Sequence, residues 1–246
     1  MKINYKNRNL QLFKLGVIFS LIILIISCAP VRITTNPKLY DTSKKIGIII
    51  VNDGISTFNY IEGKYIDSHG VDTKRFIEPL NVVSKRLNAN SLFLQTYKII
   101  FNKNNIEVKE IEGTLTFEYL DRFKKPKKTD KAYSIYDYQF IKEKFGVDRL
   151  IVAEVKYGLL LYKSGLIVVE KRGLCSISAE IIDLSDNSLL YKNESLAKIL
   201  VEGKWNIPPD YDNLYYPIRK AIENSILIEK MNFNQKKKDI TVITNE

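Results

Sequence analysis

The chain has 246 residues, 45% of them hydrophobic, and a formal net charge of +10 at pH 7. This length is sufficient for one well-filled core, and one domain is the simplest count. The composition includes one histidine and two cysteines, which excludes a metal centre built from several histidines.

The chain opens with a basic segment followed by an apolar one. Four basic residues and no acidic residue precede a run of 12 residues, Leu15 to Ile26, in which Ser20 is the one polar side chain. A helix needs about 20 apolar residues to cross a bilayer. A basic segment before a short apolar run is typical of a secretory signal peptide, which we expect to occupy residues 1–27.

The residues Ile25, Ile26, Ser27 and Cys28 follow directly and resemble the lipobox of bacterial lipoproteins. The resemblance implies cleavage between Ser27 and Cys28, a diacylglyceryl thioether on Cys28 and a further acyl chain, such as palmitate, on the new amino terminus. Several acyl chains hold a protein firmly on a bilayer. In the sorting pattern that this resembles, Ala29 favours the outer membrane, facing the periplasm. In a cell with one membrane, the anchor would lie in the cell membrane.

We expect residues 28–43 to form a polar spacer, residues 44–232 a single periplasmic domain and residues 233–246 a polar tail. Removing residues 1–27 takes away four of the 38 basic residues and none of the 28 acidic ones, which leaves a net charge of +6. The excess forms two clusters, Arg122, Lys124, Lys125, Lys127, Lys128 and Lys131, and then Lys236, Lys237 and Lys238. Both are typical of a solvated loop or tail. Attraction of the first cluster to anionic lipid headgroups stays open, whereas no recognition motif supports nucleic-acid binding.

The first half of the expected domain mixes strands and helices. The β-branched run from Lys45 to Val51 predicts a central strand covered on both faces. Helical spacing extends from Asp72 to Asn102, where Pro79 predicts a start or a break. A strand from Asn105 to Ile111 follows. Another helical face then begins at Tyr136 and includes Phe145, and we expect Gly146 to close it in a left-handed conformation.

The second half is richer in strands. Apolar or alternating patterns predict strands over Leu150 to Leu161, Ile167 to Val169, Cys175 to Leu184 and Leu189 to Val201. Ser185 to Ser188 predicts a tight turn through Asp186 and Asn187. A helix from Tyr211 to Met231 follows, with one apolar stripe made of Leu214, Ile218, Ala221, Ile222, Ser225 and Ile226. The expected fold is therefore α/β (α+β), with a mixed sheet, an antiparallel carboxy-terminal meander and helices packed on the sheet.

The segments Phe140 to Gly158 and Ile177 to Ser195 together resemble a domain of bacterial envelope lipoproteins. These include the curli secretion-channel lipoprotein, the activators of penicillin-binding proteins and the meningococcal surface lipoproteins grouped as transport auxiliaries. The matching residues are Gly146, Val147, Asp148, Ile182, Asp183, Leu184, Leu190 and Tyr191. Val147 stands where the family usually has a small residue, and Tyr191 where it often has tryptophan. The resemblance implies a fold, which by itself does not fix a function.

The segment from Lys204 to Pro217 contains the one tryptophan and two adjacent prolines. Rigid aromatic side chains are common anchors of protein interfaces. The candidate partner surface consists of Trp205, Pro208, Pro209, Tyr211 and Tyr215. The alternative is that Trp205 and Tyr211 cover the core, with Asp210 or Asp212 capping the last helix.

Other reactive side chains have structural interpretations. Asp148 and Asp183 occupy turns where a carboxylate accepts backbone hydrogen bonds, and Cys175 lies on the apolar face of a strand, which predicts a buried, inert thiol. His69 lies on a loop, without a nucleophile elbow or metal-ligand spacing elsewhere. We therefore expect neither a cofactor, a metal nor an enzymatic activity.

The resulting hypothesis is a membrane-anchored binding or assembly factor of the bacterial envelope. Its partners would be the bilayer, through the acyl chains on Cys28, and an envelope protein that the sequence does not identify. One alternative is an auxiliary subunit of an envelope transport or secretion system, as a homo-oligomer or a monomer. Another alternative is a hydrolase that uses His69.

Overall fold

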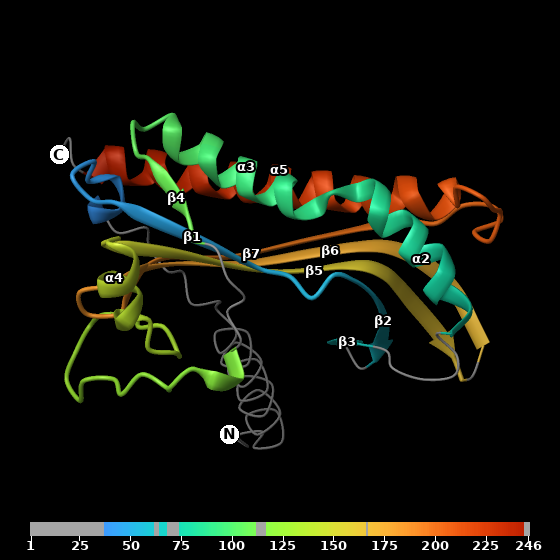
Figure 1. The fold of residues 1–246 in the computed structure, drawn as a ribbon, viewed down its shortest axis with the longest axis horizontal. Coiled ribbons are helices and arrows are strands. Elements are labelled where there is room, and N and C mark those ends of the chain that lie inside the picture. Colours follow the sequence, from blue (N-terminus) through green and yellow to red (C-terminus); the bar gives the residue numbers. More distant parts are fainter. Residues whose placement is uncertain (1–36, 62–63, 68–73, 112–116, 166, 244–246) are drawn as a thin grey trace, which may run out of the picture. The chain divides into compact units, whose positions relative to one another are not determined.

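The computed structural model describes residues 37–61, 64–67, 74–111, 117–165 and 167–243 (Figure 1). The predicted signal peptide, Ser27, Cys28 and most of the spacer therefore lie outside the described residues, as does His69. The described part forms one mixed sheet with helices packed on it, which confirms the predicted fold class.

The sheet has seven strands, built around β5. On one edge of β5, β1 and β2 follow each other and run parallel to it, and on the other edge β6 and then β7 run antiparallel. Two short outer strands extend the sheet: β4 pairs parallel with β1, and β3 pairs antiparallel with β2. The strands are β1 (Ile46–Val51), β2 (Ile55–Ile61), β3 (Lys64–Asp67), β4 (Val108–Glu110), β5 (Arg149–Ser164), β6 (Ile167–Asp183) and β7 (Ser188–Leu200).

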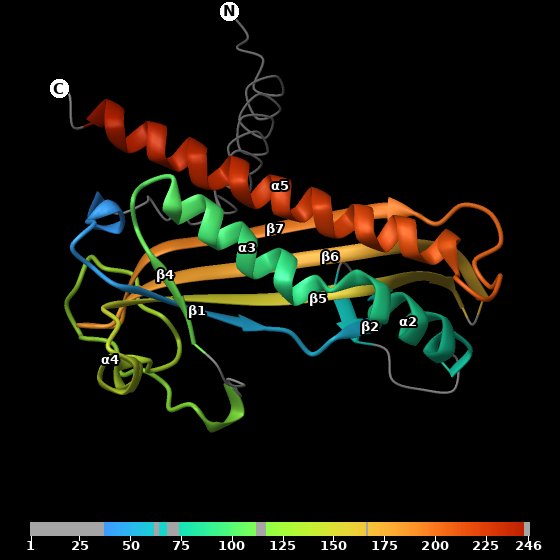
Figure 2. The ribbon, with the colours of Figure 1, turned by 45° about the horizontal axis from the view of Figure 1, so that its top comes forward.

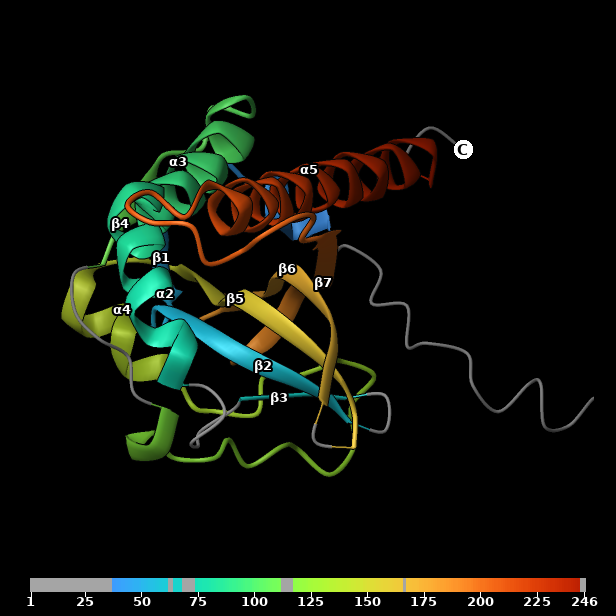
Figure 3. The same cartoon turned by 90° about the vertical axis from the view of Figure 1, so that its right-hand side faces the viewer.

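One face of the sheet carries three helices: α2 (Lys74–Leu87), α3 (Ala89–Asn102) and α5 (Asp212–Ile243) (Figures 2 and 3). The main apolar cluster lies between them and the strands. The predicted stripe of α5 is buried along its whole length, from Leu214 to Ile226. At Gly173 the backbone of α5 comes so close that a Cβ atom would lie 2.4 Å from the carbonyl carbon of Pro217. Glycine at this position lets the helix rest directly on β6.

The opposite face is covered at one end by the short helix α4 (Gln139–Phe145). Because side chains alternate along β1, Ile48 packs beneath the helices on the first face and Ile49 packs in the cluster that contains Ile141 of α4. The prediction that this strand is covered on both faces is confirmed. Gly146 closes α4 as predicted, with a φ of 65° and its N–H donating to the carbonyl of Lys142.

The long helical pattern is interrupted at a different residue from the one predicted. Pro79 lies inside α2, whereas the break between α2 and α3 is at Asn88, which has a left-handed φ of 41°. Pro79 lies in the second turn, so its missing N–H removes one hydrogen bond near the helix start, a loss that its own burial in the core helps to offset. Asparagine tolerates the left-handed conformation better than most residues, so it can separate two helices.

Three strands of the sheet, β2, β3 and β6, differ from the predicted pattern. The hairpin β2–β3 was not predicted, and β6 is continuous from Ile167 to Asp183 where the sequence suggested two separate strands. The residues Lys171, Arg172 and Gly173 interrupt the apolar pattern of β6. They nevertheless pair with Leu161, Leu160 and Leu159 of β5.

The packed part of the chain is longer than the predicted domain at both ends. Leu39, in the 3-10 helix η1 (Pro37–Tyr40), is fully buried, so packing begins before residue 44. The helix predicted to end at Met231 continues to Ile243, and Phe233 is buried against Phe101 and Tyr191. Leu39 and Phe233, which lie outside the expected domain of residues 44–232, therefore belong to the main apolar cluster.

Candidate functional site

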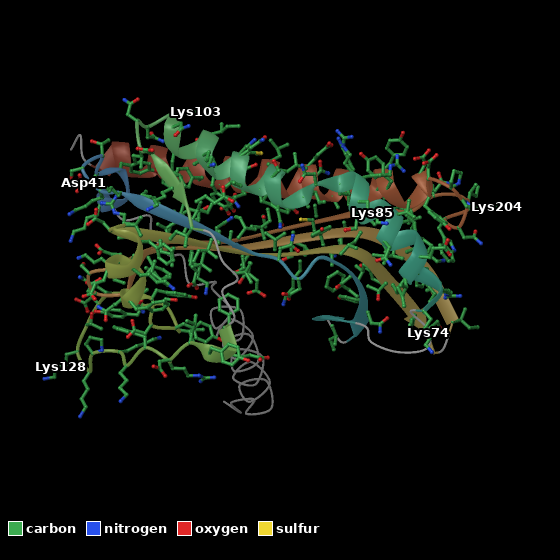
Figure 4. All side chains as sticks on the ribbon, in the orientation of Figure 1. Asp41, Lys74, Lys85, Lys103, Lys128 and Lys204 are labelled. Atoms are coloured by element: carbon green, nitrogen blue, oxygen red, sulfur yellow. The ribbon has the colours of Figure 1, made fainter. Side chains whose placement is uncertain are left out.

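The Trp205 loop, residues 201–211, joins β7 to α5 at one end of the sheet. We call this the distal end, and the opposite end, where η1 lies, the proximal end; in Figure 4 the labels of Lys204 and Asp41 mark the two ends. The loop begins where the N–H of Val201 donates to the carbonyl of Lys171 at 2.9 Å. Arg86 of α2 binds its other side by donating to the carbonyl of Asp210 and pairing with Asp212 at 3.0 Å. The loop is thus fixed to both the sheet and a helix.

Trp205 is half-buried and packs on Phe76 of α2, with ring centroids 4.6 Å apart and an interplanar angle of 45°. Arg75 lies over the Phe76 ring at 4.9 Å, and the ammonium of Lys171 lies 5.9 Å from the Trp205 ring centroid. Each exposed cation–ring contact of this kind contributes about 0.5–1 kcal/mol. The four residues, which we call the distal cluster, come from α2, β6 and the Trp205 loop.

The two cations of the distal cluster lie close enough to affect each other. The pKa of Lys171 is lowered from its ordinary value, first by burial and then by the charge of Arg75. Neither Arg75 nor Lys171 forms an ion pair with any described residue. An acidic group on a partner would relieve this repulsion, so the cluster has the chemistry to bind an anionic, partly apolar surface.

The structure divides the predicted partner surface in two. Pro208 and Pro209 are exposed, and Ile207 beside them is 52% exposed. Tyr211 and Tyr215 are instead buried, at 7% and 9% exposure; the alternative interpretation expected this of Tyr211. The part of the surface that a partner can reach is therefore the tip Ile207–Pro209 and the outer edge of the distal cluster.

The start of α5 differs from the predicted cap. The helix begins at Asp212, and the residue before it is Tyr211, which has a left-handed φ of 50°. Burial, together with a hydrogen bond and the charge of Glu78, raises the pKa of Tyr211. Asp212 lies in the first turn, where a carboxylate is favourable, and pairs with Arg86.

At the proximal end the start of the packed chain is held by a buried arginine. The side chain of Arg149 is 3% exposed, and its Nη1 donates to the carbonyls of Leu39 at 3.1 Å and Asp41 at 3.2 Å. The adjacent Asp148 accepts the N–H of Lys45 at 3.0 Å, which confirms that this carboxylate satisfies a backbone donor. No sequence pattern indicates the role of Arg149, because its partners are backbone groups more than 100 residues away.

The β6–β7 turn is a second anchor of the proximal end. Asn187 is fully buried with a left-handed φ of 61°; its Oδ1 accepts the N–H of Tyr138 at 3.1 Å and its Nδ2 donates to the carbonyl of Tyr136 at 2.8 Å. Asp183 accepts the N–H and the hydroxyl of Ser185, as its turn interpretation predicted. The sequence predicted the turn at Asn187 but not the loop that its side chain holds.

A buried carboxylate that the sequence analysis missed lies between the two ends. Glu229 of α5 is fully buried and accepts hydrogen bonds from the hydroxyls of Tyr97 at 3.3 Å and Tyr191 at 3.2 Å, and from the amide of Asn193. Burial raises the pKa of both tyrosines, and the charge of Glu229 adds to the effect. The position of Glu229, three residues after Ile226 and four before Phe233 on the apolar stripe, is the sequence signal that could have revealed it.

The remaining candidates do not form a catalytic arrangement in the described part of the chain. Cys175 is fully buried, and burial raises the pKa of its thiol to about 12, as predicted for an inert cysteine. Among the described residues, no group of three or more histidine, cysteine, aspartate or glutamate side chains could hold a metal ion. No described helix is both long enough and apolar enough to cross a bilayer.

No family model and no curated protein matches the sequence. Among solved structures, protein XCC0632 from Xanthomonas campestris is 11% identical, with a TM-score of 0.40 over 86% of this chain and 96% of that chain. Lipoprotein GNA1162 from Neisseria meningitidis is 9% identical, with a TM-score of 0.32 over 74% and 98%. The PelC dodecamer from Paraburkholderia phytofirmans is 10% identical, with a TM-score of 0.25 over 74% and 86%. These are distant similarities of fold.

Proposed function

We propose that this protein is a lipid-anchored lipoprotein of the bacterial envelope that acts by binding a partner protein, without catalysis of its own. The observation that carries the binding role is the distal cluster, in which Arg75 and Lys171 lie over the rings of Phe76 and Trp205 and form no ion pair with a described residue. The anchoring role is supported by residues 25–28, which resemble a lipobox that ends at Cys28.

The lipid anchor at Cys28 is inferred from the sequence. Acylation of Cys28 would place the domain at a membrane surface, and Ala29 favours the outer membrane with the domain facing the periplasm. Confinement to that surface raises the local concentration of the domain around any partner in the same envelope, without additional contacts.

The binding surface is inferred from the structure of the Trp205 loop and the distal cluster. The tip Ile207–Pro209 is exposed, and the loop that carries it is fixed by Arg86 and by packing of Trp205 on Phe76. A surface that is already ordered loses little conformational entropy on binding. The unpaired cations favour a partner with acidic side chains around an apolar patch.

The start of the described chain and the Trp205 loop lie at opposite ends of the sheet. From Asp183 to Lys171, β6 advances 12 residues, which at roughly 3.3 Å per residue corresponds to about 40 Å. The described chain begins beside the Asp183 end, and the Trp205 loop leaves from the Lys171 end. The Trp205 loop therefore lies about 40 Å, the length of β6 between these residues, from the start of the described chain.

The anchor is tested by Cys28→Ser in the full chain. We expect wild-type protein to fractionate with membranes and to show an acylated amino terminus at Cys28 by mass spectrometry. The variant should keep its signal peptide and lose the acyl chains. An unprocessed, unacylated wild-type protein would contradict the anchor.

The partner surface is tested by a matched pair of exposed apolar residues. Ile207 is 52% exposed on the tip, and Leu227 is 55% exposed on α5, away from the Trp205 loop. After crosslinking of intact envelopes, we expect Ile207→Asp to reduce recovery of the partner at least tenfold and Leu227→Asp to leave it unchanged. Equal recovery with both variants would reject the Trp205 loop as the surface.

The absence of catalysis is tested by His69→Ala, because His69 is the residue on which a hydrolase would depend. A binding protein keeps its partner and its cellular function after this change. Loss of function with full partner recovery would instead favour the hydrolase.

A further inference from the structure

The basic loop, residues 122–131, projects from the proximal end of the molecule. It contains six cations and one acidic residue, Asp130. All six cations are exposed: Arg122, Lys124, Lys125, Lys127, Lys128 and Lys131. Lys131 pairs with Asp186 at 2.6 Å, whereas the other five form no ion pair with a described residue.

The loop has an ordered base. The N–H of Phe123 donates to the carbonyl of Ile135 at 2.8 Å, and the rings of Phe123 and Tyr133 stack with centroids 5.4 Å apart. The N–H of Leu189 donates to the carbonyl of Ala132 at 2.8 Å, which joins the loop to β7. The sequence predicts a solvated loop. The structure adds that hydrogen bonds and ring stacking hold the base of this loop in place.

The base of the basic loop and the start of the described chain share one support. Arg149 holds Leu39 and Asp41, and Arg149 is paired with Asp183 in the β5–β6 ladder. Asp186, three residues further on, holds Lys131. Figure 4 shows Asp41 and Lys128 at the same end of the molecule, opposite Lys204.

The covalent chain limits how far this end can lie from a membrane. Eight residues, 29–36, separate Cys28 from Pro37, so nine Cα–Cα steps join the two. At about 3.3–3.6 Å per residue, a fully extended chain of this length spans about 30 Å. If Cys28 carries lipid, the proximal end is confined to within that distance of the bilayer surface.

We infer that the basic loop docks on anionic phospholipid headgroups of the bilayer that anchors Cys28, and so orients the domain with its distal end away from that bilayer. The inference rests on the proposed lipid anchor. Its basis is the set of five unpaired cations on a fixed loop, at the end of the molecule that the short spacer confines to a membrane. Cations near an anionic surface are attracted over about a Debye length, which is about 10 Å at 0.1 M salt.

The test is lysine footprinting of the full, lipidated protein in vesicles. The protein is reconstituted in phosphatidylcholine alone and in phosphatidylcholine with 30% phosphatidylglycerol, treated with a water-soluble acetylating reagent and analysed by mass spectrometry. We expect the reactivity of Lys124, Lys125, Lys127 and Lys128 to fall at least threefold in the anionic vesicles. Lys85 and Lys204, exposed and remote from the loop, should react equally in both, and about 0.5 M salt should remove the protection.

A matched pair of charge reversals completes the test. Lys127→Glu with Lys128→Glu should abolish the protection of Lys124 and Lys125, whereas Lys85→Glu with Lys220→Glu changes the net charge equally and should preserve it. Equal reactivity of the loop lysines in both vesicle types, with the protein still floating with the vesicles, would overturn the docking and leave the anchor intact. Failure of the protein to float with either vesicle type would instead reject the anchor.

Discussion

The two ends of the sheet are held together by different kinds of contact. At the proximal end, Arg149 and Asn187 are buried polar side chains that bind backbone groups of distant segments. At the distal end, Trp205, Phe76 and Tyr215 are held by ring packing and by cations such as Arg86, which lies 3.9 Å over the Tyr215 ring. Burial shields the polar contacts of the proximal end from water, whereas the pair of Arg86 with Asp212 at the distal end is 31% and 51% exposed and therefore contributes less.

This difference matches the roles proposed for the two ends. A proximal end that must present the spacer and the basic loop in one orientation benefits from contacts that permit no other arrangement. A distal end that must contact a partner benefits from apolar and cationic groups that remain accessible. Stability should therefore depend more on the buried polar residues of the proximal end than on the rings of the distal end, which the following substitutions test.

The largest effect is expected for Arg149→Met at the proximal end. Methionine fills a similar length but leaves the carbonyls of Leu39 and Asp41 without their charged donor, which should lower the free energy of unfolding by about 3 kcal/mol. Urea unfolding measures the change. Arg122→Met, on the exposed basic loop, is the control and should lie within about 0.5 kcal/mol of wild type. Equal midpoints for the two variants would show that Arg149 does not hold this end.

The second effect is expected for Asn187→Ala. Alanine loses both side-chain hydrogen bonds and strains the left-handed backbone, so we expect a loss of about 2–3 kcal/mol. Asn105 has a similar φ of 57° but is exposed, so Asn105→Ala reports the backbone strain alone, at about 1 kcal/mol. The difference between the two variants, measured by urea unfolding, is the contribution of the Asn187 side chain. A difference near zero would mean that the loop 133–138 is held in another way.

These two residues also show what the sequence can and cannot predict. The turn at Asn187, the left-handed Gly146 and the doubly covered strand β1 were predicted because each depends on local residue types and spacing. The hairpin β2–β3 was missed because it forms the outer part of the sheet, where Tyr60 and Ile66 are 40% and 47% exposed and the alternation is weak.

The candidate site divides in the same way. The aromatic and proline residues of the Trp205 loop are neighbours in the sequence, so the sequence alone predicts them as a candidate surface. Arg75 and Lys171 come from segments about 130 and 34 residues before Trp205. Periodicity in the sequence does not predict which cations contact which rings over such separations. Contacts of this kind, like those of Arg149 with Leu39, exist only once the sheet has formed.

The middle of the sheet, which both ends share, gives the third prediction. Burial raises the pKa of the Cys175 thiol from 9.0 to about 12, so above pH 9 the unfolded chain releases this proton while the folded chain retains it. Below pH 9 the thiol is protonated in both states, so it does not change the free energy of unfolding. As the pH rises from 9 toward 12, the free energy of unfolding falls by up to about 1.4 kcal/mol per pH unit. Urea unfolding between pH 8 and pH 10 should show a smaller decline for Cys175→Ala than for wild type. Parallel curves would show that the thiol is not protected by the core.

The smallest effect on stability is expected for Trp205→Ala at the distal end. Trp205 is half-buried and packs mainly on Phe76, so its removal should lower the free energy of unfolding by about 0.5–1 kcal/mol, the range of a single aromatic pair. Partner recovery from crosslinked envelopes should fall much more steeply than stability, because the same ring supports Lys171 and the exposed tip. Trp205→Phe, which keeps a ring against Phe76, is the control. It should retain most of the stability and most of the partner recovery. If Trp205→Ala instead unfolds the protein as readily as Arg149→Met does, the distal rings are part of the structural core, and the contrast between the two ends is wrong.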